Sequence, residues 1–110
     1  MSYTPAADAP LASTLLGITA ASIDRCDLSE RELMIARIAA LAAVDASAAS
    51  YAFNAKAAAI SGITLEDARD ILIAIAPVIG TAKTVSAAEG IVVGLDLAIA
   101  LEDFLGDLGE

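Results

Sequence analysis

The stretch LSERELMIARIAALAAVDASAASYAFNAKAAAISGITLED, residues 28–67, decides the fold class. It holds two alanine-rich segments, and a residue type that commonly caps helices stands before each of them. Alanine has the highest helix propensity of any residue, and strand-forming residues are sparse in this stretch. The stretch therefore predicts two consecutive α-helices, and we expect an all-α fold of five or six helices for the whole chain.

The run Ser29-Glu30-Arg31-Glu32 has the pattern of a capping box, which predicts that a helix starts there. This helix is expected to continue to about Val44. Its large apolar residues cover most of its circumference rather than one stripe, which is typical of a central helix. These residues are Leu33, Met34, Ile35, Ile38 and Leu41.

The next helix can be capped by Asp45 or Ser47, and it is predicted to end at Ser61 because Gly62 supplies a left-handed residue. Thr64 with Asp67 three residues later indicates another helix start. That helix is expected to reach about Ile75, and Pro77 is expected to end or kink it.

The remaining segments complete a single helical domain over residues 10–105. Residues 1–9 are interpreted as a flexible arm, residues 10–25 as the first helix, and residues 82–104 as one bent helix or two, weakened by Gly90 and Gly94. Residues 106–110 form an acidic tail in which Gly106 and Gly109 disfavour regular structure. The tail either docks to a basic partner or serves solubility alone.

The composition predicts self-association. Hydrophobic residues make up 58% of the 110 residues, against about 45–50% in an ordinary globular domain. A small domain has a high ratio of surface to volume, so this much apolar surface leaves exposed patches unless another subunit covers them. We expect a homo-oligomer.

Charge and residue usage argue against several classes of partner. Six Lys and Arg stand against fifteen Asp and Glu, a net charge of −9 that repels nucleic acid. Histidine is absent and Cys26 is the single cysteine, so we expect no metal site, no cofactor and a reducing, cytoplasmic location. The apolar stretch 71–94 is interrupted by Pro77, Lys83 and Glu89, and we expect no membrane span.

Polar residues gather on one side of the second alanine-rich helix. Ser47, Ser50, Tyr51 and Asn54 are spaced so that they share a face. They form either the wall of a pocket that binds a small ligand or a helix side that faces water. Arg37 lies among aliphatic residues, where it binds a carboxylate ligand, pairs with an acid such as Glu89, or reaches solvent.

The order of elements resembles the carboxymuconolactone decarboxylase family, which includes the alkylhydroperoxidase D-like proteins. The resemblance covers about residues 28–95 and rests on three segments. They are LSEREL at 28–33, SGITLED at 61–67 and APVIGT at 76–81. It implies a compact helical bundle that assembles as a homotrimer or homohexamer.

Redox members of that family carry a Cys-x-x-Cys-x-x-x-His run before the glycine stop. Counted back from Gly62, Ser47 and Ser50 occupy the cysteine positions and Asn54 the histidine position. A serine hydroxyl forms no disulfide and an asparagine does not titrate, so thiol peroxidase or disulfide reductase activity is not expected. Glu32 resembles the acid that the family carries on the preceding helix.

Two functions follow from these patterns. The first is a non-redox binding or scaffold protein with ligand-binding residues Arg37, Ser47, Ser50 and Asn54. The alternative is a cofactor-independent lyase, decarboxylase or isomerase acting on a small carboxylated metabolite, with Arg37 as anion anchor and Glu32, Tyr51 or Asn54 as catalytic candidates. A cavity where Arg37 and Glu32 converge on Asn54 would favour the enzyme.

Overall fold

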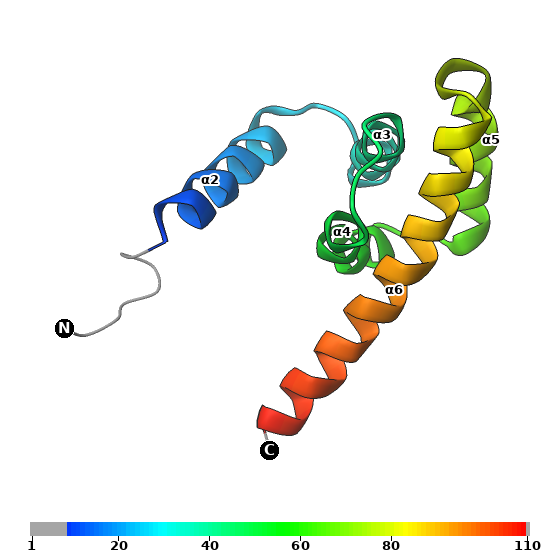
Figure 1. The fold of residues 1–110 in the computed structure, drawn as a ribbon. Coiled ribbons are helices and arrows are strands. Elements are labelled where there is room, and N and C mark those ends of the chain that lie inside the picture. Colours follow the sequence, from blue (N-terminus) through cyan, green and yellow to red (C-terminus); the bar gives the residue numbers. More distant parts are fainter. Residues whose placement is uncertain (1–8, 110) are drawn as a thin grey trace.

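The computed structural model describes residues 9–109 and the side chains of residues 9–104. It is all-helical, with no strand in that range, which confirms the predicted fold class (Figure 1). Helices α3 to α6 form a compact unit. The helices are α2 (Pro10–Arg25), α3 (Glu30–Ala43), α4 (Ala48–Ile60), α5 (Leu65–Ile79) and α6 (Thr81–Gly109).

Helix α3 contacts α4, α5 and α6. It starts with the expected capping box, in which Ser29 Oγ accepts from the Glu32 amide and the Glu32 carboxylate accepts from the Ser29 amide. Its fully buried residues lie one turn apart at Met34, Ile38 and Ala42. The buried surface is thus one stripe with half-buried residues on either side, rather than most of the circumference as the apolar pattern predicts.

The closest helix contact joins α4 to α6 and depends on two glycines. A Cβ atom added at Gly94 would lie 2.7 Å from the Ala48 carbonyl oxygen and 2.7 Å from Tyr51 Cβ. One added at Gly90 would lie 2.8 Å from Tyr51 Cε2. The two glycines, four residues apart, therefore form a notch on α6 that receives the Tyr51 ring and the α4 backbone.

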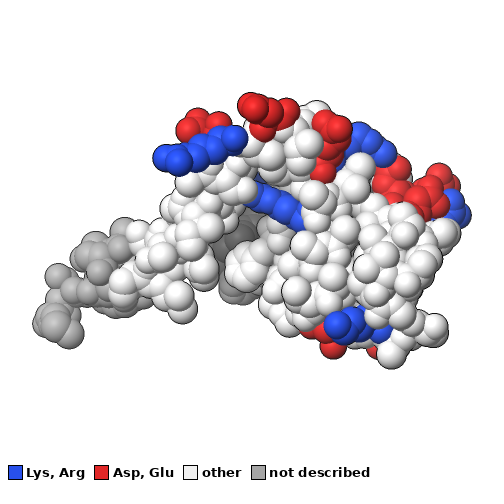
Figure 2. All heavy atoms as spheres, turned by 90° about the horizontal axis from the view of Figure 1, so that it is seen from above, with Lys and Arg blue, Asp and Glu red and all other residues white. Residues whose placement is uncertain are grey.

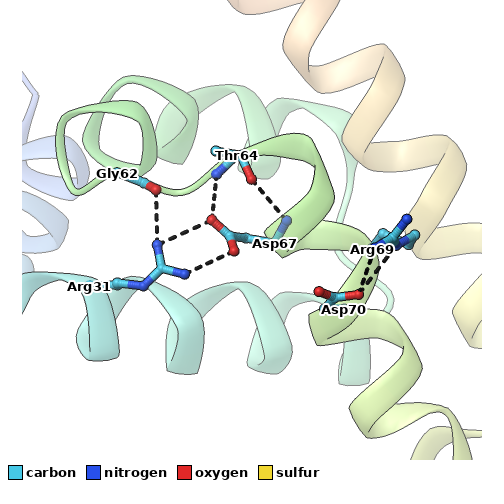
Figure 3. Close-up of polar contacts among 6 residues, drawn as sticks. All are labelled: Arg31, Gly62, Thr64, Asp67, Arg69 and Asp70. Atoms are coloured by element: carbon cyan, nitrogen blue, oxygen red, sulfur yellow. Dashed lines mark hydrogen bonds and ion pairs between the residues drawn. The ribbon is translucent and has the colours of Figure 1, made fainter.

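A polar clasp ties α3 to the connection between α4 and α5 (Figure 3). Arg31 Nη2 and Nη1 donate to the Asp67 carboxylate at 2.9 and 3.1 Å, and Nη1 also donates to the Gly62 carbonyl oxygen at 2.9 Å. Asp67 completes the predicted capping box with Thr64. The hydrogen bonds from Arg31, followed by that from the Thr64 amide, hold the pKa of Asp67 well below its usual range.

The turn between α3 and α4 is held by α6. Asp45 adopts a left-handed backbone with φ 54°, a conformation that aspartate tolerates better than most residues. Its carboxylate accepts a 2.6 Å hydrogen bond from the Ser86 hydroxyl. Lys83 Nζ donates to the Ala43 carbonyl oxygen at 3.2 Å, placing a cation at the negative end of α3.

Several expected boundaries differ from the structure. Helix α5 continues past Pro77 to Ile79, because a proline in the last turn removes one hydrogen bond close to a natural end. Helix α6 is one element, with Gly90 and Gly94 in its interior. It runs to Gly109, so the expected loss of regular structure at Gly106 is not observed. Most of the expected N-terminal arm lies outside the described residues.

Helix α2 packs against none of α3 to α6 and contains no buried residue (Figure 1). The leucines of this helix are 55–71% exposed. Its interhelix hydrogen bond runs from Arg37 Nη2 on α3 to the Ser22 hydroxyl, at 3.3 Å. In the single chain, α2 is an apolar helix without an apolar partner.

Candidate functional site

An apolar groove opens beside α4, with a volume of about 150 Å³. We call it the α4 groove. It is partly open to solvent, and residues from four helices and one connection line it. The lining residues are Ile38, Leu41, Tyr51, Asn54, Ala55, Ala58, Ala59, Ile63, Thr64, Leu65, Ala68, Ile91 and Leu95. Small alanine side chains on α4 leave this space between larger aliphatic residues of the neighbouring elements.

Asn54 is the one amide side chain on the wall of the groove. It is half-buried, and its Nδ2 donates to the Ser50 carbonyl oxygen at 2.9 Å. That bond fixes the orientation of the amide. Among the described residues Oδ1 has no partner, so it remains an acceptor for a group that enters the groove.

Ser47 and Ser50 serve the start of α4 rather than the groove. Ser47 Oγ accepts from the Ser50 amide at 3.4 Å and lies 3.3 Å from Ser50 Oγ. Neither serine lines the groove. Of the four polar residues expected to share one face, the structure places Tyr51 and Asn54 at the groove and uses the serines in capping.

Tyr51 is 6% exposed, and its ring packs in the core with Ala42, Leu72 and Ala87. Its hydroxyl is buried without a hydrogen-bond partner among the described residues. Burial, assisted by the charge of Asp45, raises the pKa of Tyr51. A phenol that holds its proton this tightly, inside the core, is a poor proton donor at neutral pH.

Glu32 and Arg37 lie outside the α4 groove. The backbone amide of Ser29, and then its hydroxyl, lower the pKa of Glu32 through hydrogen bonds, so this exposed carboxylate is a helix cap that stays ionised. Arg37 donates to Ser22. The ion pairs among the described side chains are Arg31–Asp67 and Arg69–Asp70, so the pair considered between Arg37 and Glu89 is not formed.

The groove walls formed by Ala55, Ala58, Ile63 and Leu95 were not identified from the sequence. The signal that could have indicated them is the difference in side-chain size between α4 and the elements that surround it. Helix α4 carries alanine where its neighbours carry isoleucine and leucine, and small residues facing large ones leave a hollow when the backbones cannot approach further. The backbones of α4 and α6 are already in contact at Gly94.

Three further features bear on function. Cys26 is half-buried in the connection after α2 and does not line the groove. Within the described residues, no three His, Cys, Asp or Glu side chains gather as metal ligands. By length and composition the segment Thr81–Phe104 of α6 could cross a membrane, a property that core helices of soluble proteins share.

Comparison with protein-family models, with curated proteins and with solved structures finds no match for this chain.

Proposed function

We propose that this chain is a homo-oligomeric binding protein without thiol redox activity, similar in design to the carboxymuconolactone decarboxylase family. Its α4 groove binds a small, mainly apolar ligand that carries one hydrogen-bond donor. The observation behind this proposal is the composition of the groove. Its walls are mainly aliphatic, and they include the Asn54 amide, whose Nδ2 is held by the Ser50 carbonyl oxygen.

The size of the groove indicates the size of the ligand. At about 150 Å³ it has the volume of an engineered apolar cavity that binds benzene, about 150 Å³. Drug-sized ligands occupy about 300–1,000 Å³. A single six-membered ring with a hydroxyl or amine that donates to Asn54 Oδ1 therefore fits both the space and the chemistry.

The same geometry supports binding better than the lyase alternative. A carboxylated substrate needs a cation, and Arg37 lies outside the groove, as does Glu32. Proton transfer needs a group that titrates near neutrality. Asn54 does not titrate, and the pKa of Tyr51 is raised. Positions 47 and 50, where redox members of the similar family have cysteines, carry serines at the start of α4, and Ser47 caps that helix.

A ligand titration tests the groove. Phenol, benzene and benzoate are titrated while the thermal unfolding midpoint is measured. A ligand at ten times its Kd stabilises the folded state by about 1.4 kcal/mol, which raises the midpoint by several degrees. We expect phenol and benzene to raise it and benzoate to have no effect, because burying a carboxylate without a cation is costly.

Two variants locate the site. Ala55→Phe fills the groove and is expected to abolish the effect of phenol. Ala57→Phe, on the exposed side of the same helix, is the matched control and leaves that effect intact. Asn54→Ala removes the acceptor, so it is expected to reduce the effect of phenol and to leave that of benzene unchanged. Stabilisation by benzoate alone, or equal responses of Ala55→Phe and Ala57→Phe, would contradict the proposal.

The absence of redox activity has its own test. Thiol-dependent consumption of peroxide by the purified protein is expected to match that of a Cys26→Ser variant and of buffer. Turnover that requires Cys26 would overturn this part of the proposal.

A further inference from the structure

The surface of the single chain is larger than a folded domain of its mass exposes. It amounts to 7718 Å², whereas a monomer of 11.0 kDa exposes about 5,600 Å². If the first eight residues were fully extended they would account for about 1,200 Å². After this area is subtracted, the surface still exceeds that of a folded domain made of the remaining residues by roughly 1,200 Å². One side of a standard protein interface buries about 800 Å².

The radius of gyration also indicates that the single chain is less compact than a folded domain of its length. The radius of gyration is 15.6 Å, against about 13 Å for a compact domain of this length. Charged side chains in Figure 2 gather along one edge and in a small cluster on the opposite edge, leaving a broad uncharged surface between them. The face seen in this view is therefore largely uncharged.

Helix α2 supplies part of that surface. Residues 10–23 carry no charge, yet none of them is buried. Leu11, Leu15 and Ile18 recur at steps of four and three and form one apolar stripe, here named the α2 stripe, whereas Ser22 on the same side accepts the hydrogen bond from Arg37. A helix of 16 residues without a packing partner is marginal in water. Its stability in this protein thus requires a surface that covers the stripe.

The distal half of α6 supplies a second stripe. Leu97, Leu101 and Phe104 follow Gly94 at steps of three, four and three, which keeps them on the side of α6 that meets α4 at the glycine notch. We name these three residues the α6 stripe. They are 39–59% exposed. Glu89, Asp96 and Asp103 recur every seven residues on the other side of the helix, where they remain in water.

We propose that α2 of one copy of this chain packs along the α6 stripe of a neighbouring copy. Helix α2 is long enough to cover the α6 stripe, because its 16 residues span about 24 Å whereas residues 97–104 span about 12 Å. This exchange rests on the homo-oligomer of the proposed function and assigns its contact surfaces. A reciprocal exchange closes a dimer, and a head-to-tail exchange closes a ring.

Glutamate substitutions on each stripe test the exchange. Leu15→Glu and Leu101→Glu change residues that are 55% and 50% exposed in the single chain, so each subunit retains its own packing. In the assembly each places an unpaired carboxylate in an apolar contact, which weakens association on the order of a hundredfold or more. Matched controls are Ser13→Glu and Val92→Glu, which lie on the opposite sides of α2 and α6.

Light scattering coupled to gel filtration measures the mass, and circular dichroism checks helicity. We expect the parent, Ser13→Glu and Val92→Glu to have a molar mass that is two or more times 11.0 kDa. Both leucine variants are expected to have the mass of the monomer. A double variant Leu15→Glu/Leu101→Lys is expected to recover part of the assembly, because the two charges then pair, whereas Leu15→Glu/Leu101→Glu is not.

Three results would overturn the exchange. An oligomer that neither leucine variant alters uses other surfaces, which leaves the homo-oligomer of the proposed function intact. A monomeric parent removes both the exchange and the assembly but not the groove, whose ligand titration is independent. A parent that binds phosphatidylcholine–phosphatidylglycerol vesicles through these leucines instead of self-assembling assigns the stripes to a membrane surface.

Discussion

Gly94→Ala is expected to destabilise the protein by forcing α4 away from α6. The added Cβ would lie 2.7 Å from the Ala48 carbonyl oxygen, 2.7 Å from Tyr51 Cβ and 3.1 Å from the Ala52 amide nitrogen. Two of these three atoms belong to the α4 backbone. No rotamer change can move them, so the contact is relieved when the helix as a whole shifts.

The magnitude follows from two opposing effects. Alanine is favoured over glycine in a helix by about 1 kcal/mol. Overpacking costs about 1–3 kcal/mol, and the upper end applies where backbone atoms are in the way. We expect a net loss of about 2 kcal/mol, which lowers the thermal midpoint of a domain this size by about 10 °C.

The same substitution at two other helical glycines provides the controls. At Gly90 the added Cβ meets the Tyr51 ring edge at 2.8 Å, and a ring can tilt, so a smaller loss is expected. At Gly17 nothing lies within 4 Å, and α2 is expected to gain about 0.5–1 kcal/mol.

Urea unfolding followed by far-ultraviolet circular dichroism, at one protein concentration, measures the free energy of unfolding of the parent and the three variants. The expected order of stability is Gly17→Ala, parent, Gly90→Ala and Gly94→Ala. A Gly94→Ala variant as stable as the parent, or more stable than Gly90→Ala, would refute the close α4–α6 contact.

Three further substitutions test the remaining contacts. Asp67 has a lowered pKa in the folded state, so the clasp adds stability above about pH 4, the ordinary pKa of an aspartate, and loses it as the pH falls further. Asp67→Asn is therefore less stable than the parent at pH 7, and urea midpoints of the two should converge in acid; a constant difference would contradict the clasp. Tyr51→Phe removes a buried hydroxyl without a partner and is expected to be neutral or to stabilise by up to about 1 kcal/mol in urea unfolding, whereas a large loss would show that the hydroxyl is bonded. Thr64→Ala removes the cap of α5 and is expected to cost about 1 kcal/mol in the same assay, against no change if the cap is unformed.

The helix boundaries were predictable where a local interaction sets them. Ser29 and Thr64 each form their capping box within four residues of sequence, and Gly62 has the left-handed backbone, φ 81°, that its position as a helix stop predicts. Such contacts involve near neighbours, so the order of residues is sufficient to predict them.

The candidate site was less accessible to prediction because it depends on distant residues. Helical spacing correctly places Tyr51 beside Asn54, but it does not say that Tyr51 faces the core while the serines cap the helix. Arg37 was expected to bind a carboxylate, to pair with an acid or to reach solvent, and its hydrogen-bond partner Ser22 lies on a helix whose position no pattern fixes. The glycines of α6 lower helix propensity locally, and their role in contacting α4 emerges only when the two helices are paired.

The isolation of α2 within the single chain has a consequence for spectroscopy. If other copies hold this helix in place, its 16 residues lose their support as the protein is diluted, and ellipticity becomes a function of concentration. By mass action the unfolding temperature also rises with the amount of protein in the cell. The amide protons of α2 then exchange with deuterium faster as the protein is diluted, whereas the exchange rate of the α3 amide protons does not change.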